Sequence, residues 1–325
     1  MQNQRDALKV TIVGCGRWGS FIGWYLDRIG HRVTLYGLED APSFSRLVKE
    51  RKNEYIELPD SIGLTTDIAT TKDSDVIVIS VNSQNLRSVA CQFKAVGVEN
   101  KTIVLCMKGI EIETGKRLSE IVEETVSPTN RIAVWIGPGH VQSFYRGIPN
   151  CMVIDSKDGE TKDFIIQRFS GDLIRFYYGN DLIGNEIGAA SKNVIGIAAG
   201  MLDGFGLTSL KGALMARGTR EISRLIKALG GNELSAYGLC HLGDYEATIF
   251  SSYSHNRQFG ESFVKKETYS LLAEGYYTAK ALMLLGEKTG VELPICRAVY
   301  DILYHDADPK ETMNGLFKRS LKEEF

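Results

Sequence analysis

The chain has 325 residues, which suggests two domains, because single hydrophobic cores rarely grow beyond about 250–300 residues. Its 38 basic and 40 acidic residues leave a formal net charge of -2, which argues against general binding of nucleic acid or anionic membrane surfaces. No apolar run reaches the roughly 18–20 residues of a bilayer span, and Met1–Val10 lacks the apolar core of a signal peptide. We therefore expect a cytoplasmic protein with a small-molecule substrate, no membrane span and no nucleic-acid partner.

The cysteines and glycines exclude two further classes. The six cysteines form no C-x-x-C pair and have no histidine at zinc-ligand spacing, so we predict free thiols and no metal site. Cys15 and Cys106 are expected to be small buried hydrophobic residues rather than catalytic thiols. Glycine is frequent and proline scarce, 33 residues against 7, which indicates close approaches of the backbone rather than a disordered linker.

The first 180 residues alternate short β-rich runs with segments of helical length. Lys9–Val13, a glycine turn, a helical stretch to Ile29 and a second strand at Arg32–Tyr36 make one βαβ unit. The next three runs are almost continuous in valine and isoleucine and fit buried parallel strands: Asp75–Val81, Thr102–Met107 and Arg131–Ile136. Cys151–Asp155 and Leu173–Tyr178 are expected as edge strands.

Beyond about Asp181 the β-rich runs stop and helical spacing dominates, over Ile183–Met201, Leu214–Leu229 and Tyr269–Gly290. The predicted fold is α/β: a Rossmann-like, doubly wound, mostly parallel sheet over residues 1–180, followed by an all-α substrate and catalytic domain over residues 181–325. The charged segment Lys318–Phe325 is expected to be a solvated tail.

A glycine motif, Gly14-Cys15-Gly16-Arg17-Trp18-Gly19, follows the first strand and opens the first helix. In a dinucleotide-binding turn the first glycine permits the tight turn and the second lets the backbone approach the pyrophosphate, while the third lets the helix pack on the strand. The βαβ setting therefore predicts binding of NAD or NADP.

The end of the second strand bears on the choice of cofactor. Glu39 lies 20 residues beyond Gly19, and no arginine or lysine occupies positions 37–40, so the sequence favours NAD over NADP. The alternative is that Glu39 and Asp40 only solvate a loop.

Two lysines have the placement expected of a dehydrogenase. Removal of a hydride from a carbinol carbon needs a group that takes the hydroxyl proton, and a lysine can serve when it is buried. Lys192 lies in the otherwise apolar and small-residue helix Ile187–Met201, where a solvated face would carry more charges. Lys108 follows the strand Thr102–Met107, at the carboxyl edge where doubly wound sheets bind ligands.

Several separated motifs follow one another in an order that resembles the NAD(P)-dependent sn-glycerol-3-phosphate dehydrogenases and cover nearly the whole chain. They are Gly14–Gly19, Met107-Lys108-Gly109-Ile110-Glu111, Gly137-Pro138, Ser191-Lys192-Asn193-Val194-Ile195-Gly196-Ile197-Ala198-Ala199-Gly200, Gly243-Asp244, Ser254-His255-Asn256-Arg257-Gln258-Phe259-Gly260 and Glu274-Gly275.

The resemblance implies an oxidoreductase that interconverts dihydroxyacetone phosphate and sn-glycerol 3-phosphate, works as a homodimer and binds its cofactor between the domains. Lys192 would be the proton acceptor, Lys108 would polarise the carbonyl, and Asp244 would orient the catalytic lysine. The implied cofactor contacts are Gly14, Gly16, Arg17, Trp18, Gly19, Glu39, Lys108, Val141, Arg257, Leu272 and Glu274. The implied substrate contacts are Lys108, Gly137, Gly139, Asn193, Asp244, Thr248, Ser254, His255, Asn256 and Arg257.

Three departures from the family pattern concern the substrate. Gly139 stands where the family has serine or threonine, His255 replaces the first arginine of R-N-R, and Glu246 lies in an otherwise apolar segment that here reads Tyr245-Glu246-Ala247. A lost charge-assisted hydrogen bond to phosphate would cost about 1.5–3 kcal/mol, unless Arg257 compensates. The alternatives are thus a paralogue that acts on another small polyol or hydroxy compound, or a dinucleotide-binding sensor without catalysis.

Overall fold

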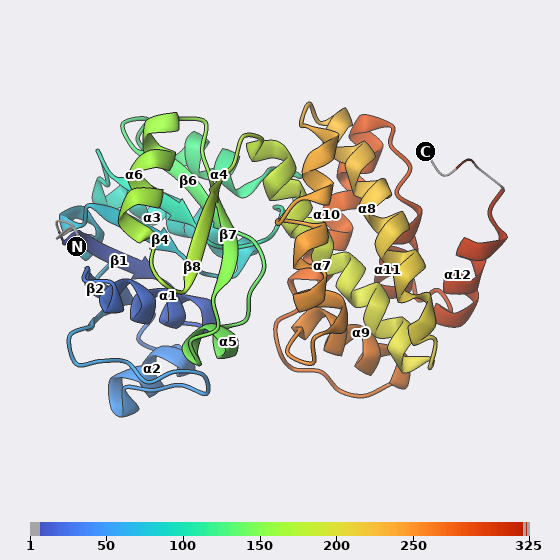
Figure 1. The fold of residues 1–325 in the computed structure, drawn as a ribbon, viewed down its shortest axis with the longest axis horizontal. Coiled ribbons are helices and arrows are strands. Elements are labelled where there is room, and N and C mark those ends of the chain that lie inside the picture. Colours follow the sequence, from blue (N-terminus) through green and yellow to red (C-terminus); the bar gives the residue numbers. More distant parts are fainter. Residues whose placement is uncertain (1–6, 321–322, 324–325) are drawn as a thin grey trace. The chain divides into compact units, whose positions relative to one another are not determined.

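The structure is a computed structural model that describes residues 7–320 and residue 323. The expected solvated tail, Lys318–Phe325, lies partly outside the described residues, as do the first six residues of the expected N-terminal domain. The chain forms two compact units (Figure 1). One comprises residues 7–108 and 116–182, and the other comprises residues 109–115 and the chain from residue 183 onward.

The first unit is built on one eight-stranded sheet with the order β3-β2-β1-β4-β5-β6-β7-β8. All neighbouring strands are parallel except β6 and β7, which confirms the predicted doubly wound, mostly parallel sheet. The strands are β1 (Lys9–Val13), β2 (Arg32–Tyr36), β3 (Gly63–Thr65), β4 (Val76–Ile79), β5 (Thr102–Leu105), β6 (Arg131–Ile136), β7 (Asn150–Asp155) and β8 (Ile174–Tyr178).

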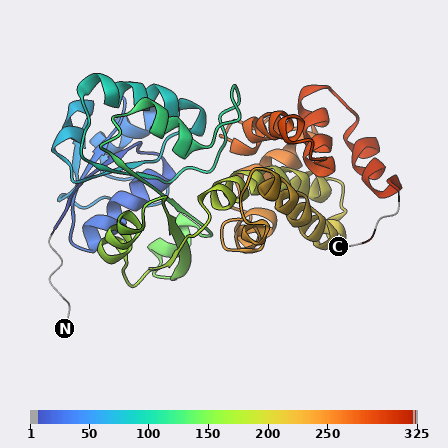
Figure 2. The same cartoon turned by 90° about the horizontal axis from the view of Figure 1, so that it is seen from above.

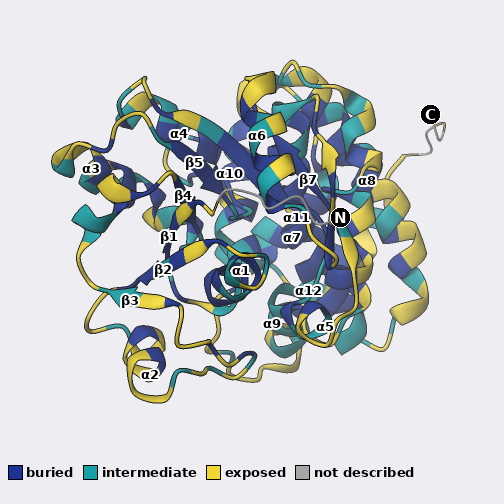
Figure 3. Ribbon diagram, turned by 60° about the vertical axis from the view of Figure 1, so that its left-hand side comes forward, coloured by how far each residue is buried: buried dark blue, intermediate teal, exposed yellow. Residues whose placement is uncertain are grey.

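Helices cover both faces of this sheet, as Figure 2 shows, and this explains the continuous apolar strands. All four residues of β4 and of β5 are buried, which suits strands covered on both sides (Figure 3). The helices of the unit are α1 (Arg17–Arg28), α2 (Pro42–Glu50), α3 (Leu86–Val96), α4 (Leu118–Thr125), α5 (Val141–Tyr145) and α6 (Gly159–Phe169).

The expectation for β7 was wrong in one respect. The strand pairs with β6 on one side and β8 on the other, so it lies inside the sheet and only β8 forms that edge. Only its first two residues are exposed or half-buried; the next four are buried, and Met152 and Ile154 belong to the core. Strand β3, which forms the opposite edge, has three residues and was not predicted.

The second unit is helical and has its own core around α7 (Leu182–Gly204). Small residues let other helices approach α7 closely: a Cβ atom on Gly200 would lie 1.9 Å from the carbonyl oxygen of Arg257. The other helices are α8 (Lys211–Ala228), α9 (His255–Lys265), α10 (Glu274–Thr289), α11 (Pro294–Tyr304) and α12 (Pro309–Gly315). Among the described residues, no helix combines the length and apolar character that crossing a bilayer requires.

A loop that follows β5 belongs to the helical unit rather than to the sheet that precedes it. Ile110 is fully buried in the helical core, and the Lys288 ammonium donates a hydrogen bond of 2.7 Å to the carbonyl oxygen of Thr114. The chain therefore passes between the two units at Lys108, again at Gly115, and finally at Leu182.

Candidate active site

The turn between β1 and α1 holds three glycines with different surroundings. Gly14 has a φ of +107°, and a Cβ atom there would lie 2.3 Å from the carbonyl oxygen of Ser80. A Cβ atom on Gly19 would lie 1.9 Å from the carbonyl oxygen of Gly14, so α1 packs directly on the turn. A Cβ atom on Gly16 would meet no described protein atom within 4 Å. Gly14 and Gly19 thus close the turn, while Gly16 leaves space beside the start of α1.

The start of α1 suits an anion. Its first turn, which lies wholly within the described residues, contains no acidic side chain and receives no side-chain cap from Gly16. The amide groups at a helix start lack partners within the helix and carry a partial positive charge, which is the arrangement that binds a pyrophosphate. The residues present therefore fit a dinucleotide.

Arg17 and Trp18 lie in the first turn of α1. The Arg17 guanidinium lies 3.4 Å from Nδ1 of His140, and Trp18 packs edge-on against Phe21 at 5.5 Å between ring centroids. Both side chains are half-buried. The arginine adds a positive charge near the turn, and the tryptophan anchors the helix to the core.

Cys15 lies between the glycines as a buried thiol, and burial raises its pKa to about 11. It is therefore uncharged at neutral pH, as expected of a small buried hydrophobic residue, and all six cysteines are free. Glu39 lies three residues beyond β2 and is exposed, as is Asp40.

Lys108 follows β5 at the carboxyl edge of the sheet. Its ammonium donates a hydrogen bond of 2.6 Å to the carbonyl oxygen of Gly137, in the loop that follows β6. The two strands are parallel neighbours, so their carboxyl ends bring these residues to one edge.

The structure gives a physical reason for Gly139. Its φ is +150°, and a Cβ atom would lie 2.4 Å from the ring of Phe144. A serine or threonine at this position would require the ring to move and the backbone to adopt an unfavourable conformation. The absence of a hydroxyl-bearing side chain at position 139 therefore goes together with the packing of the Phe144 ring against Gly139. The nearby Val141 side chain is fully buried in the core, so only its main chain could contact a cofactor.

Lys192 lies on α7 with only 7% of its surface exposed, and two acceptors direct its ammonium. The Nζ atom lies 2.8 Å from Oδ2 of Asp244 and donates a hydrogen bond of 2.6 Å to Oγ1 of Thr248. The Thr248 hydroxyl in turn donates to the main-chain carbonyl oxygen of Asp244 at 2.8 Å. Asp244 is 1% exposed, so a lysine and a carboxylate are paired away from solvent.

These partners come from an irregular stretch of chain. Asp244 ends a short 3-10 turn, Leu242–Asp244, and Thr248 lies in a π-helical turn, Glu246–Phe250. In the latter turn Ala247 and Thr248 are buried whereas Glu246 is exposed. The extra carboxylate noted in the sequence therefore lies on the solvent side of the segment that holds Thr248.

Asn193 and Asn256 join three helices beside Lys192. The side-chain amide of Asn256 donates a hydrogen bond of 3.1 Å to Oδ1 of Asn193 and accepts one of 2.8 Å from the main-chain amide of Gly275. Helices α7, α9 and α10 are thus tied together at one point. Lys192, Asn193, Asp244, Thr248 and Asn256 all lie in this part of the helical unit.

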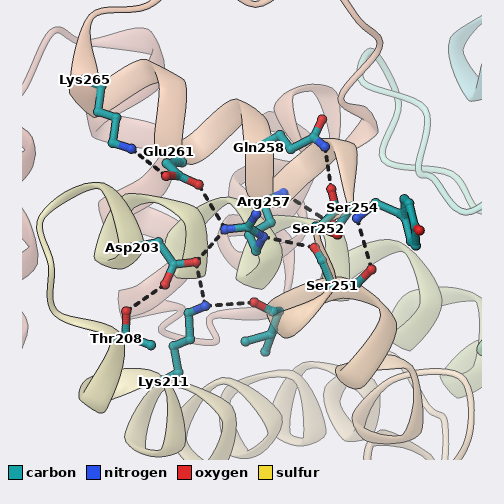
Figure 4. Close-up of polar contacts among 12 residues, drawn as sticks. Asp203, Thr208, Lys211, Ser251, Ser252, Ser254, Arg257, Gln258, Glu261 and Lys265 are labelled. Atoms are coloured by element: carbon teal, nitrogen blue, oxygen red, sulfur yellow. Dashed lines mark hydrogen bonds and ion pairs between the residues drawn. The ribbon is translucent and has the colours of Figure 1, made fainter.

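Arg257 is held by acidic partners (Figure 4). Its Nη1 atom lies 2.8 Å from Oδ2 of Asp203 and 3.0 Å from Oε2 of Glu261, and its Nε atom donates to the carbonyl oxygen of Ser251. Lys211, 4% exposed, also pairs with Asp203 at 2.6 Å. These cations, with the Thr208 hydroxyl as a further donor, hold the pKa of the Asp203 carboxyl below its usual range, although burial acts in the opposite direction.

The remaining predicted positions lie at helix starts. Ser254 is the N-cap of α9, and its hydroxyl accepts a hydrogen bond from the main-chain amide of Arg257. His255 is the first residue of α9 and is half-buried. Glu274 is the first residue of α10 and is half-buried, whereas Leu272, just before that helix, is 44% exposed.

Sequence reasoning missed four polar residues around this site: Asp203, Lys211, His241 and Tyr245. None of the four lies within one of the sequence motifs, and their contacts in the structure reveal them. His241 and Tyr245 are fully buried, and the Tyr245 hydroxyl lies 2.7 Å from Nε2 of His241. A histidine three residues before a predicted substrate aspartate was the available signal.

Comparisons with known proteins agree with this geometry. Residues 9–162 match the family model for the NAD-dependent glycerol-3-phosphate dehydrogenase N-terminus, and residues 181–314 match the model for its C-terminus. Glycerol-3-phosphate dehydrogenase [NAD(P)+] of Thermoanaerobacter sp. (strain X514) is 34% identical over 330 residues, which is 98% of this chain and 99% of that protein. Its counterpart in Agathobacter rectalis is 35% identical over 97% of each chain.

A solved structure with a similar fold is glycerol-3-phosphate dehydrogenase from Coxiella burnetii. The TM-score is 0.89 and the sequence identity 26%, with 96% of this chain and 99% of that chain covered. Both the sheet and the helical unit are therefore shared with an enzyme of this kind.

Proposed function

The chain belongs to the NAD-dependent glycerol-3-phosphate dehydrogenase family, and we propose that it interconverts dihydroxyacetone phosphate and sn-glycerol 3-phosphate with NAD(H) or NADP(H). One observation carries the proposal beyond the family: the buried ammonium of Lys192 is held by Asp244 and Thr248. A buried lysine fixed in this way is suited to proton transfer rather than to solubility.

Lys192 supplies the proton chemistry. The nicotinamide, when bound, exchanges a hydride with the carbon that bears the hydroxyl group. In the oxidation direction the neutral amine of Lys192 takes the hydroxyl proton, and in the reduction direction its ammonium returns that proton to the carbonyl oxygen. Asp244 stabilises the ammonium form by charge, and Thr248 fixes the direction of Nζ.

Lys108 is proposed to polarise the substrate carbonyl. Its hydrogen bond to Gly137 fixes the charged group at the carboxyl edge of the sheet, where ligands of doubly wound folds bind. A fixed positive charge stabilises the negative charge that develops on the carbonyl oxygen during reduction. Asn193 and Asn256, which lie beside Lys192, are proposed as neutral hydrogen-bonding partners of the substrate.

For the cofactor, we propose that the glycine turn and the start of α1 hold the pyrophosphate and that Arg17 contributes charge. The exposed Glu39 beyond β2 favours NAD, because a carboxylate accepts hydrogen bonds from the ribose hydroxyls and repels a 2'-phosphate. Trp18, the main chain of Val141, Leu272 and Glu274 remain predicted contacts.

The substrate phosphate is the part of the proposal that needs the sharpest test. Arg257 already contacts Asp203, Glu261 and Ser251. These contacts argue against Arg257 taking the role of the family's first arginine, whose position His255 occupies in this chain. We therefore propose that His255 and Ser254, at the start of α9, and not Arg257, face the phosphate.

Steady-state turnover of the full chain tests the function. We expect oxidation of NADH with dihydroxyacetone phosphate, and a lower kcat/KM by a factor of about ten or more with dihydroxyacetone, which lacks the phosphate. Equal kcat/KM values for the two would indicate a paralogue without phosphate recognition. Absence of turnover with both NADH and NADPH, while either cofactor still binds, would indicate a dinucleotide-binding sensor.

We also propose that the enzyme is a cytoplasmic homodimer. The free cysteines suit a reducing compartment. Light scattering coupled to size-exclusion chromatography should give about twice the mass of one chain, and cell fractionation should recover the protein with cytoplasmic markers.

A further inference from the structure

The segment that carries Asp244 and Thr248 makes a second contact with α7, one helical turn before Lys192. His241 is fully buried, and its Nδ1 atom lies 2.8 Å from the carbonyl oxygen of Gly188. Gly188 and Lys192 are four residues apart on α7 and therefore lie on the same helix face. His241 and Asp244 are three residues apart, so the two contacts join the same two elements side by side.

The hydrogen-bond partners fix the proton on the His241 ring. A carbonyl oxygen can only accept, so Nδ1 carries the hydrogen and donates it to Gly188. Nε2 of the neutral ring is then an acceptor, and the Tyr245 hydroxyl, 2.7 Å away, donates to it. Burial lowers the pKa of His241 to about 4 and raises the pKa of Tyr245 above its usual range, so both groups are neutral near pH 7.

Gly188 allows this contact. A Cβ atom at that position would lie 3.1 Å from Cβ of His241, tighter than most contacts between side chains. In a regular α-helix the carbonyl group of residue 188 also accepts the main-chain amide of residue 192. A carbonyl oxygen has two lone pairs, so the His241 ring bonds to the same peptide group that holds the Lys192 backbone.

We propose that His241, with its tautomer set by the Gly188 carbonyl group and its Nε2 atom satisfied by Tyr245, is a positioning residue that keeps Asp244 and Thr248 at their distances from the Lys192 ammonium throughout turnover. The inference rests on the proposed role of Lys192 as the proton acceptor. The Lys192–Asp244 ion pair attracts strongly only while Lys192 is charged, and turnover makes that charge come and go. The bond from His241 to Gly188 joins neutral groups, so it persists when the ion pair weakens.

This role also accounts for Tyr245, a polar residue in a segment that is apolar in the glycerol-3-phosphate dehydrogenase family. Its ring is fully buried, and its hydroxyl satisfies the ring nitrogen of His241 that would otherwise lack a donor in an apolar core. The tyrosine therefore acts on Lys192 through the histidine and does not touch the substrate.

Four variants of the full chain test the proposal. His241→Leu removes the link, whereas His241→Asn keeps an amide donor at the position of Nδ1. We expect His241→Leu to lower kcat by about 10- to 100-fold, since small misplacements of a reacting group have such effects, with the KM for NADH changed less than about twofold. His241→Asn should recover most of this loss, and Tyr245→Phe should fall between the two.

Met313→Ala serves as the matched control, because Met313 is buried in the helical core but lies on α12, which carries no predicted site residue. It should lower the thermal midpoint and leave kcat unchanged. The proposal is overturned if His241→Leu keeps the parent kcat, if His241→Asn is as impaired as His241→Leu, or if Met313→Ala loses kcat to the same extent as His241→Leu.

A second measurement separates this inference from the proposed function. If the parent does not turn over dihydroxyacetone phosphate, the proposed function fails, and the link is then tested by the rate at which acetic anhydride labels Lys192, followed by mass spectrometry. We expect a faster rate in His241→Leu than in the parent or in Met313→Ala. An unchanged rate in His241→Leu would overturn the positioning role.

Discussion

Replacing Lys192 with methionine separates the lysine's contribution to folding from its contribution to turnover. Methionine has a similar length and no charge, so the substitution removes the ammonium and leaves most of the volume filled. Asp244, 1% exposed, would lose a cation at 2.8 Å and retain a carboxylate in the core. Breaking a buried pair by removing one partner costs about 3–5 kcal/mol.

The same change should abolish most of the activity. Removing a general base lowers the rate by about 10²–10⁴-fold. A loss of 3–5 kcal/mol would lower the thermal midpoint of a unit of this size by about 6–20 °C. Both quantities can be measured on the full chain, by circular dichroism during heating and by NADH consumption with dihydroxyacetone phosphate.

A double variant distinguishes the two effects. Lys192→Met combined with Asp244→Leu removes both charges, and replacement of a whole buried pair by apolar residues is often neutral for stability. We expect the double variant to recover most of the thermal midpoint and none of the turnover. A single variant as stable as the parent would refute the buried pair, and a single variant as active as the parent would refute Lys192 as the proton acceptor.

Three further predictions follow from particular contacts. Gly19→Ala places a Cβ atom 1.9 Å from a backbone oxygen, so it should weaken NADH binding and destabilise the chain by about 1–3 kcal/mol. Gly16→Ala meets no described atom, so it should weaken NADH binding in calorimetry without destabilising the fold. Equal stability of the two variants would contradict the different packing of the two glycines. Gly139→Ser should lower the denaturant midpoint without improving the KM for dihydroxyacetone phosphate, and an improved KM would show that the hydroxyl is tolerated beside Phe144. Two buried groups should give opposite pH dependences of stability. The pKa of His241 falls from 6.5 to about 4 on folding, so its contribution to stability is lost as pH falls from about 6.5. The pKa of Glu221 rises from 4.5 to about 7 on folding, so its contribution to stability is lost as pH rises through about 7. Each contribution is about 3 kcal/mol. Denaturation between about pH 4.5 and 6.5 should therefore show stability that rises with pH in Glu221→Gln, which retains His241, and stability that falls with pH in His241→Asn, which retains Glu221. Parallel curves for the two variants would argue against both pKa shifts.

The sheet could be predicted because its strands are nearly pure in β-branched residues and are separated by helical segments. Burial on both faces makes such runs easy to recognise, as in β4 and β5. The inner place of β7 was not predictable, because strand order is a property of pairing and not of composition. Strand β3 is too short to show a pattern.

The candidate site was found where residue type and context conflicted. Lys192 stood out as a single charge in an apolar helix, and its partner Asp244 could be named only through the family resemblance. His241 and Asp203 were missed because histidine and aspartate are ordinary in loops and helix ends, and their importance lies in partners distant along the chain. Gly139 was interpreted as a lost hydroxyl, whereas the structure adds the ring of Phe144 as its reason.

The loop of residues 109–115 makes the two halves of this gene product inseparable by a single cut. A fragment that begins at residue 183 would lack Ile110, which is fully buried among the helices, and would also lack the carbonyl group that Lys288 contacts. Any exchange of the helical half between relatives would have to carry this heptapeptide with it. The part of the chain that would have to be exchanged as one piece is therefore discontinuous in sequence. Lys108, a proposed catalytic lysine, is the last residue before its first segment.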